Sequence, residues 1–389
     1  MYAPLKATVN PVGYCIAEHS VHSHVHTRKL FDVAPLWPGW IGTTEENEAF
    51  DKEEPLLSRT PQHTLRADDE EVLAAIYRHS YFAFTMVRGG ADCMRHLEIM
   101  ASGSLPLFPD LQDVCRDPYC MSGYPKHLLR EVLTLPGIEY AFRSPHNRTY
   151  FRFGIRRNMI RAPTIDRLRF DLVRYHSLAR QLLEYTQKHL TCGALASYVL
   201  KTMSVVDEDP TKAPLLLIVP SFSDYLSMGI EEGFAELGLH YATNLVWGTD
   251  PPWTVDARSI DQTADELRAK SVAQCDKKMY SGAYTWCMRV QHPTLGRWKD
   301  EDISMAIRNR RFRSIVFTNL FIVDEMVTNV MPFVQDIARY YTPSDVAFVD
   351  TRDIPLAPRQ YNPIVRSMIQ NGSHLFVREM HTLLQMTDD

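Results

Sequence analysis

Hydrophobic and polar positions first form a clear pattern in residues 68–108. The segment DDEEVLAAIYRHS opens with acidic residues and carries apolar residues at helical spacing, so it predicts a helix with a complemented dipole. The apolar run YFAFTMV predicts a short buried strand after it. RGGADCMRHLEIMASG then predicts a glycine turn, a helix and a glycine stop, and SLPLF predicts a second strand. Together these elements predict a β-α-β unit.

Helical spacing continues through the rest of the first half. PKHLLREVLTL predicts a helix over residues 125–135. Residues 165–203 predict a long amphipathic helix that breaks near residues 191–193. The first 65 residues show weak periodicity, and KLFDVAPLW is their clearest strand candidate.

A second alternation of strands and helices follows the acidic, proline-containing segment SVVDEDPTKAP, which predicts a linker over residues 204–214. LLLIV predicts a buried strand, and residues 221–240 predict a helix that Gly238 helps to end. RSIVFTNLF and VAFVDTRD predict further central strands on either side of a helix over residues 325–341. We therefore expect an α/β protein with two Rossmann-like domains, residues 1–203 and 215–389, that face each other across a ligand-binding cleft.

Composition excludes several classes of protein. The 389 residues are 45% hydrophobic and 23% charged, which is typical of a soluble globular chain long enough for two cores. No run of about 18 apolar residues occurs, and the start MYAPLKATVN lacks the layout of a signal peptide, so we expect a cytoplasmic protein without a transmembrane segment. The net charge of −5 gives no basic footprint for nucleic acid, although RFGIRRNMIR is locally basic.

Cysteine and histidine placement predicts no metal site. The seven cysteines are scattered and include no C-x-x-C pair, which favours free thiols over a disulfide framework or a thiolate zinc site. EHSVHSHVHT carries four histidines, but no cysteine or paired carboxylate accompanies them at ligand spacing. We interpret this run as facing solvent or a partner.

The predicted helix at residues 91–102 has a polar face. At helical spacing Asp92, Arg95 and Glu98 share that face, while Leu97 and Met100 point toward a core. The alternative interpretation is a surface helix whose Arg95 and Glu98 form an ordinary ion pair.

The start of this helix suits an anion. Gly89 and Gly90 allow close backbone approach where N–H groups and the helix dipole favour a phosphate, and Arg88 and Arg95 add charge-assisted bonds. Glu98, one turn deeper, is placed to accept from sugar hydroxyls. The motif is not the G-x-G-x-x-G fingerprint, so it does not indicate a dinucleotide fold.

Several segments resemble exostosin-like glycosyltransferases of the GT-B type. On the donor side these are RGGADCMRHLEIMASGSLPLFPDL, YPKHLLREVL and LLEYTQKHLTCGALASYVL. On the acceptor side they are PSFSDYLSMGIEEGFAELG, DKKMYSGAYTW, VAFVDTRD and SHLFVREM. The resemblance covers most of the chain from about residue 70, with the donor-like half first, so the chain looks like a circular permutant of that group.

The resemblance implies a metal-independent transfer of a sugar from a nucleotide-sugar to a glycan or other hydroxyl acceptor, with no cofactor beyond the donor. It implies that Glu98 binds the ribose and that Arg88 and Arg95 bind the diphosphate. The donor-binding candidates are Arg88, Gly89, Gly90, Asp92, Arg95, His96, Glu98 and Lys126.

On the acceptor side Asp224 follows a predicted strand, where the general base of an inverting reaction would lie, or it is a helix cap. Tyr225, Asp350 and Asp353 are further candidates, and the two aspartates equally suit turns. Two alternatives remain open. One is a non-catalytic glycan- or partner-binding protein on the same fold, and the other is another nucleotide-dependent enzyme such as an oxidoreductase.

Overall fold

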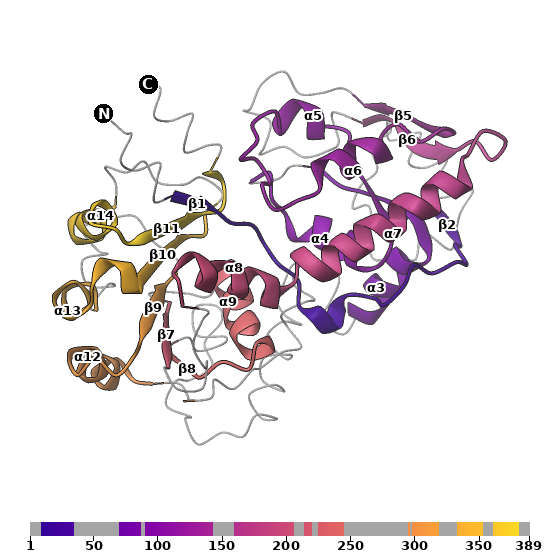
Figure 1. Cartoon of the computed structure of the whole chain (residues 1–389). Coiled ribbons are helices and arrows are strands. Elements are labelled where there is room, and N and C mark those ends of the chain that lie inside the picture. The colour runs from indigo at the N-terminus through magenta and orange to yellow at the C-terminus, as the bar shows by residue number, and fades with distance from the viewer. Residues whose placement is uncertain are drawn as a thin grey trace, which may run out of the picture.

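The computed structural model describes residues 9–34, 70–86, 90–142, 159–205, 214–219, 225–244, 295, 298–318, 333–352 and 361–380. Over these residues the chain forms a six-stranded parallel sheet, a three-stranded parallel sheet and an antiparallel pair of strands. The two parallel sheets lie in separate lobes (Figure 1). We call the lobe with the three-stranded sheet the first lobe and the other the second lobe. The prediction of an α/β protein is confirmed.

The first lobe contains the predicted β-α-β unit. Its parallel sheet has the order β2-β3-β4, with β2 at Phe31–Val33, β3 at Ser80–Phe84 and β4 at Leu105–Leu107. Between β3 and β4 lies α4 (Met94–Ala101), and Gly103 takes a positive φ of 69° at its end, as the glycine stop predicts. The other elements of the lobe are η1 (Glu18–Ser20), α3 (Glu70–Arg78), α5 (Leu111–Val114), α6 (Lys126–Val132), β5 (Ile138–Phe142), β6 (Met159–Ile165) and α7 (Leu172–His189).

The predicted break after α7 is confirmed. A second helix, α8 (Cys192–Thr202), begins at the N-cap Thr191, whose hydroxyl accepts from the backbone N–H of Ala194 at 3.3 Å. The chain changes direction there, so α8 leaves the first lobe and packs against α9 (Tyr225–Glu236) in the second lobe (Figure 1). Gly233 permits the close contact, because a Cβ at this position would overlap the backbone carbonyl of Cys192.

The six-stranded sheet of the second lobe has the order β1-β11-β10-β9-β7-β8. Because β8 and β9 flank β7 on opposite sides, the switch point of the sheet lies between β7 and β9. The strands are β1 (Val9–Pro11), β7 (Leu215–Ile218), β8 (Tyr241–Thr243), β9 (Ser314–Phe317), β10 (Val346–Asp350) and β11 (His374–Val377). The helices are α8, α9, α12 (Asp300–Arg308), α13 (Val334–Tyr340) and α14 (Pro363–Gln370), with η6 (Pro343–Asp345) before β10.

Helices cover both faces of this sheet, which explains its continuous apolar strands. Alternate residues of β7 enter different cores: Leu216 and Ile218 pack in the core on the side of α12, α13 and α14, while Leu215 and Leu217 pack on the side of α8 and α9 (Figure 1). All four residues are buried.

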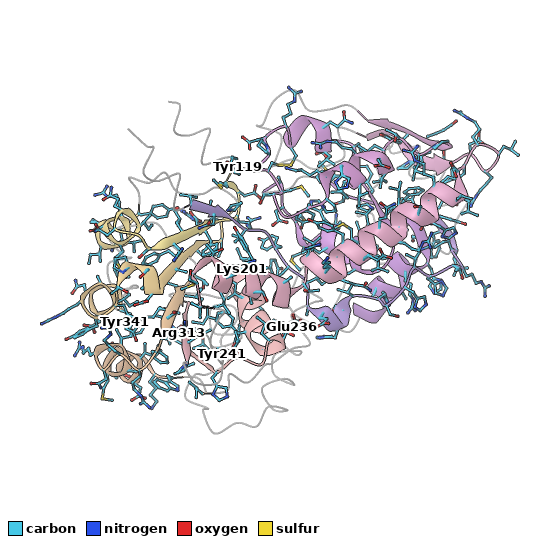
Figure 2. The ribbon with its side chains drawn as sticks, viewed as in Figure 1. Tyr119, Lys201, Glu236, Tyr241, Arg313 and Tyr341 are labelled. Atoms are coloured by element: carbon cyan, nitrogen blue, oxygen red, sulfur yellow. A yellow bond between two sulfur atoms is a disulfide. The ribbon has the colours of Figure 1, made fainter. Side chains whose placement is uncertain are left out.

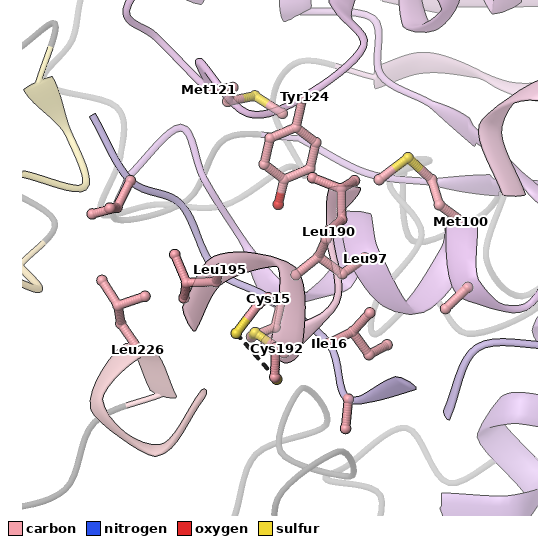
Figure 3. Packing of buried hydrophobic residues seen from close by; sticks show 14 of the residues in the cluster. Cys15, Ile16, Leu97, Met100, Met121, Tyr124, Leu190, Cys192, Leu195 and Leu226 are labelled. Atoms are coloured by element: carbon pink, nitrogen blue, oxygen red, sulfur yellow. Dashed lines mark hydrogen bonds between the residues drawn. The ribbon is translucent and has the colours of Figure 1, made fainter. Parts of the chain in front are cut away.

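The second of these cores continues into the first lobe. It joins Leu97 of α4 and Leu190 with Leu226 of α9, and Figure 3 shows them around the buried thiols Cys15 and Cys192, whose sulfur atoms lie 3.1 Å apart. The N-terminal segment runs through this contact, because Ile16 N–H donates to the Leu190 carbonyl at 2.9 Å. Residues 1–203 were expected to form one domain, yet β1 pairs with β11 of the second lobe.

Candidate functional site

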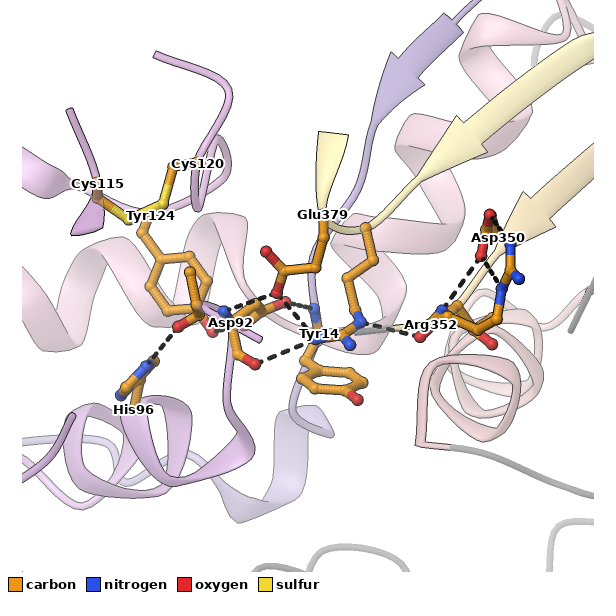
Figure 4. A network of polar contacts seen from close by, with 12 residues as sticks. Tyr14, Asp92, His96, Cys115, Cys120, Tyr124, Asp350, Arg352 and Glu379 are labelled. Carbon is orange, nitrogen blue, oxygen red and sulfur yellow. Dashed lines mark hydrogen bonds and ion pairs between the residues drawn. A yellow bond between two sulfur atoms is a disulfide. The ribbon is translucent and has the colours of Figure 1, made fainter. Parts of the chain in front are cut away.

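Polar residues of both lobes meet where β11 ends and α4 begins (Figure 4). We call this group the junction cluster: Tyr14, Asp92, Tyr124, Arg378 and Glu379. Parallel strands present their carboxyl ends at one edge of a sheet, so the residues after β1 and β11 emerge together there. Tyr14 follows β1, and Arg378 and Glu379 follow β11.

Asp92 is the centre of the junction cluster. Its carboxylate accepts from the Tyr14 backbone N–H at 2.5 Å and from the Tyr124 hydroxyl at 2.6 Å. Its own N–H donates to Glu379 Oε1 at 3.0 Å, and its carbonyl accepts from Arg378 Nη1 at 3.1 Å. These contacts hold Asp92 in the segment before α4, which begins at Met94 instead of near Ala91 as predicted. The prediction that Asp92 shares a helix face with Arg95 and Glu98 is therefore wrong.

Arg378 is fully buried and is fixed from several sides. Its Nε donates to the Thr351 carbonyl at 2.9 Å, and its guanidinium lies 4.4 Å from the centre of the Tyr14 ring. Its Nη1 also donates to Glu379 Oε1 at 3.2 Å. A buried arginine requires such compensation, because an isolated charge in the interior is strongly destabilising.

Gly90 leaves space in the segment just before α4, and the Glu379 side chain of the same chain fills that space. A Cβ at Gly90 would overlap Glu379 Oε1 and would lie 3.2 Å from Arg378 Nη1. The carboxylate of Glu379 thus lies where the sequence predicts a bound phosphate. Arg88 and Gly89 lie outside the described residues. No local pattern predicts this contact, since Glu379 and Asp92 are 287 positions apart.

Arg95 and Glu98 lie on a helix that is buried almost all round. Every residue of α4 except Arg95 is buried, so the expected polar face does not reach solvent and the surface-helix alternative is also wrong. Burial lowers the pKa of Arg95, but Tyr77, Cys93 and Glu98 raise it by more, and the net pKa is raised. Arg95 also hydrogen-bonds the side chain of Tyr77 on α3.

Glu98 acts electrostatically on the second lobe. The pKa of Tyr225, the first residue of α9, is raised to about 12, mainly by burial and in smaller part by the negative charges of Glu98 and Cys93. Tyr225 also meets Tyr14 edge to face, with ring centres 6.0 Å apart. The structure therefore links Glu98 and Tyr225 electrostatically, although the sequence nominated them separately on the donor and acceptor sides.

His96 ties α4 to its neighbours. Its Nε2 lies 3.0 Å from the Ala91 carbonyl and its Nδ1 lies 2.7 Å from the Thr85 hydroxyl. Since a carbonyl only accepts, Nε2 carries the proton and Nδ1 accepts from Thr85. The ring stacks on Phe108 at 4.6 Å. Both nitrogens of this donor-binding candidate thus bond within the chain.

Lys126 also bonds within the chain. Its ammonium donates to the carbonyls of Asp117, Pro118 and Cys120 at 3.4, 2.8 and 2.6 Å, so a diphosphate contact would have to replace one of them. Burial, and to a smaller extent the charge of Arg130, lower the pKa of Lys126, while the charge of Asp117 raises it by less. The same loop carries a disulfide between Cys115 and Cys120, so the prediction of free thiols is wrong for this pair. Cys115 and Cys120 are five positions apart and lie on one turn, and their spacing in the sequence did not predict that turn.

Asp350 lies at the end of β10 in a buried ion pair. Arg352 Nε and Nη2 donate to its two oxygens at 2.8 and 2.5 Å (Figure 4). The Tyr361 hydroxyl also donates to Asp350, at 3.0 Å. The Arg352 backbone N–H also donates to Asp350 Oδ1 at 3.3 Å, which is the turn-forming contact that the alternative interpretation predicted. Asp224 and Asp353 lie outside the described residues.

Polar residues near the carboxyl ends of β7, β8 and β9 were not predicted. The Ser227 hydroxyl donates to the Thr318 hydroxyl at 2.9 Å, which links the start of α9 to the end of β9. Asn244 bonds both the N–H and the carbonyl of Val219, at 2.8 and 3.0 Å. Polar side chains just after apolar strands are the signal that could have nominated them.

Within the described ranges no group of three or more His, Cys, Asp or Glu side chains is placed to hold a metal ion. In the same part of the chain no helix is long and apolar enough to cross a membrane. No protein family, curated protein or solved structure matches the chain. The resemblance to exostosin-like glycosyltransferases therefore stays a prediction that rests on the sequence motifs.

Proposed function

We propose that the chain is a glycosyltransferase that moves a sugar from a nucleotide-sugar to a glycan or another hydroxyl acceptor. In this proposal the lobes are the two Rossmann-like domains of a GT-B arrangement, with the donor on the side of the first lobe. The lobes each contain a parallel sheet, and ligands of such sheets bind beyond the carboxyl ends of the strands. The junction cluster lies at that position for β1 and β11.

The observation that supports the proposal is the electrostatic interaction between Glu98 of the first lobe and Tyr225 of the second lobe. Glu98 supplies a buried carboxylate that suits sugar hydroxyls, and Tyr225 supplies a hydroxyl from the other lobe. Because its pKa is raised to about 12, Tyr225 stays protonated near neutral pH and can donate a hydrogen bond to a reacting oxygen. Donor and acceptor groups on facing lobes are what a transfer between two substrates requires.

The remaining roles in the proposal come from the sequence. Arg88 would contact the diphosphate, and Asp224 would act as general base if the reaction inverts configuration. A leaving nucleoside diphosphate gains stabilisation from backbone N–H groups and arginines, so we expect transfer without a bound metal ion.

The test is turnover of a panel of UDP-, GDP- and CMP-sugars, with binding followed first by thermal shift. A donor at about 100 times its Kd adds about 2.7 kcal/mol of stability. We expect Glu98→Gln and Arg95→Ala each to lower turnover about 100-fold, equivalent to about 2.7 kcal/mol.

Glu236→Gln is the control, since it makes the same change at a carboxylate of a different helix, α9, where Glu236 accepts backbone N–H groups from Glu18 and Gly193 (Figure 2). It should leave turnover unchanged. Equal rates in wild type and Glu98→Gln would refute the site. Binding without any turnover would favour the non-catalytic glycan-binding alternative, and a response to NAD alone would favour an oxidoreductase.

A further inference from the structure

The segment just before α4 binds an anionic group of the chain itself, the carboxylate of Glu379. Glu379 Oε1 accepts from the backbone N–H of Asp92 at 3.0 Å and from Arg378 Nη1 at 3.2 Å, and Gly90 leaves room for it. Glu379 is 1% exposed. A backbone N–H, a guanidinium and a glycine beside a helix start are the groups with which proteins bind phosphates.

The cationic part of this arrangement does not depend on Glu379. Arg378 is held by the Thr351 carbonyl, by the Asp92 carbonyl and by the face of the Tyr14 ring. Asp92 in turn is held through its carboxylate by Tyr14 and Tyr124. The donors therefore keep their positions if the Glu379 side chain turns away, and a preorganised set of donors binds an anion without further ordering.

Glu379 itself lies in the turn that follows β11, not in a ladder of backbone hydrogen bonds. Rotation of its side chain would release both donors to an incoming anion. The exchange of one anion for another keeps the Arg378 charge compensated, which a buried guanidinium requires.

We propose that the Asp92 N–H, Arg378 and Gly90 form a binding site for the diphosphate of a nucleotide-sugar, and that the Glu379 carboxylate occupies this site in the unliganded chain as an internal competitor. The identity of the ligand as a nucleotide-sugar rests on the proposed function. The preference for a diphosphate anion rests only on the contacts of these residues. An internal competitor raises the apparent Kd of the site, because the intrinsic Kd is divided by the fraction of molecules in which the site is free.

The probe is inorganic pyrophosphate, titrated by calorimetry into the full chain. Glu379→Gln keeps the shape and an acceptor oxygen but removes the competing charge, so we expect it to lower the Kd for pyrophosphate about tenfold or more. Glu236→Gln is the control. Like Glu379, Glu236 is a carboxylate that accepts from the backbone, in its case from the N–H groups of Glu18 and Gly193, and its substitution should leave the Kd for pyrophosphate unchanged. The double variant Arg378→Met/Glu379→Gln loses both charges together and should lose pyrophosphate binding.

Thermal shift keeps the test decisive if Glu379→Gln is less stable than wild type. Pyrophosphate should then raise the melting temperature of Glu379→Gln more than that of wild type or Glu236→Gln. Equal pyrophosphate responses in wild type and Glu379→Gln overturn the inference. So does an equal gain in Glu236→Gln, which would show a general effect of lost negative charge, or binding that survives in the double variant.

The two proposals fail separately. Tighter pyrophosphate binding by Glu379→Gln with no nucleotide-sugar turnover by wild type would support the anion site and refute glycosyl transfer. Turnover by wild type with no change in pyrophosphate affinity in Glu379→Gln would support glycosyl transfer and refute the role of Glu379.

Discussion

Substitution of Gly90 by alanine tests the geometry of the junction cluster directly. Gly90 is not among the described glycines with positive φ, so the backbone itself accepts an alanine. The obstacle is contact: the added Cβ would overlap Glu379 Oε1 and approach the Glu379 Cδ to 2.9 Å. Glu379 must therefore move from its place.

The cost has two parts. Overpacking of a buried site costs about 1–3 kcal/mol, and loss of the charge-assisted bond from the Asp92 N–H to Glu379 costs about 1.5–3 kcal/mol. We expect Gly90→Ala to lower the free energy of unfolding by about 2.5–6 kcal/mol in total.

Urea unfolding followed by tryptophan fluorescence measures this change through the midpoint at constant m value. Gly123→Ala is the matched control, because a Cβ at Gly123 meets only Leu190 Cδ2 at 3.9 Å. Removing this glycine should change stability by no more than about 1 kcal/mol, and in the stabilising direction.

A double-mutant cycle identifies the cause. In a Glu379→Ala background the overlap is gone, so Gly90→Ala should cost little there, and the coupling between the two positions should be close to the full cost of Gly90→Ala in wild type. The same loss with and without Glu379 would refute the contact, and so would a Gly90→Ala protein as stable as Gly123→Ala.

Three further outcomes follow from the site. Tyr124→Phe should lower the free energy of unfolding by about 1.5–3 kcal/mol through the lost bond to Asp92, while Tyr119→Phe on the exposed loop should not; equal effects would contradict this assignment. Because the folded-state pKa of Tyr225 is raised to about 12, its contribution to stability is complete below about pH 10 and is lost as the pH rises toward 12, so Tyr225→Phe should flatten the urea-measured stability profile in that window. Lys126→Met should speed backbone hydrogen exchange in residues 115–120, and unchanged exchange would show that the three carbonyl contacts do not hold the loop.

Local patterns in the sequence were sufficient for most of the elements. The acidic start and apolar spacing of residues 68–80 predicted α3, the run LLLIV predicted β7, and the break near Thr191 predicted the start of α8. These signals are local, since helix caps, apolar periodicity and glycine stops act within a few residues. The three-residue β1 and the β5–β6 pair were missed, although β5 (IEYAF) places Ile138, Tyr140 and Phe142 at alternate positions.

The sequence by itself thus determined an α/β protein with a β-α-β unit around α4 and a second parallel sheet after residue 214. It also nominated Glu98, from the helical spacing of polar residues and the resemblance, and Tyr225, which lies beyond a buried strand, because both signals are local. Only the tertiary structure decided that β1 joins β11, that α4 is buried on nearly every side, and that Glu379 lies against Gly90. Each of these depends on which distant surfaces pack together, and a sequence pattern reports the amount of apolar surface to be buried but not the partner that covers it.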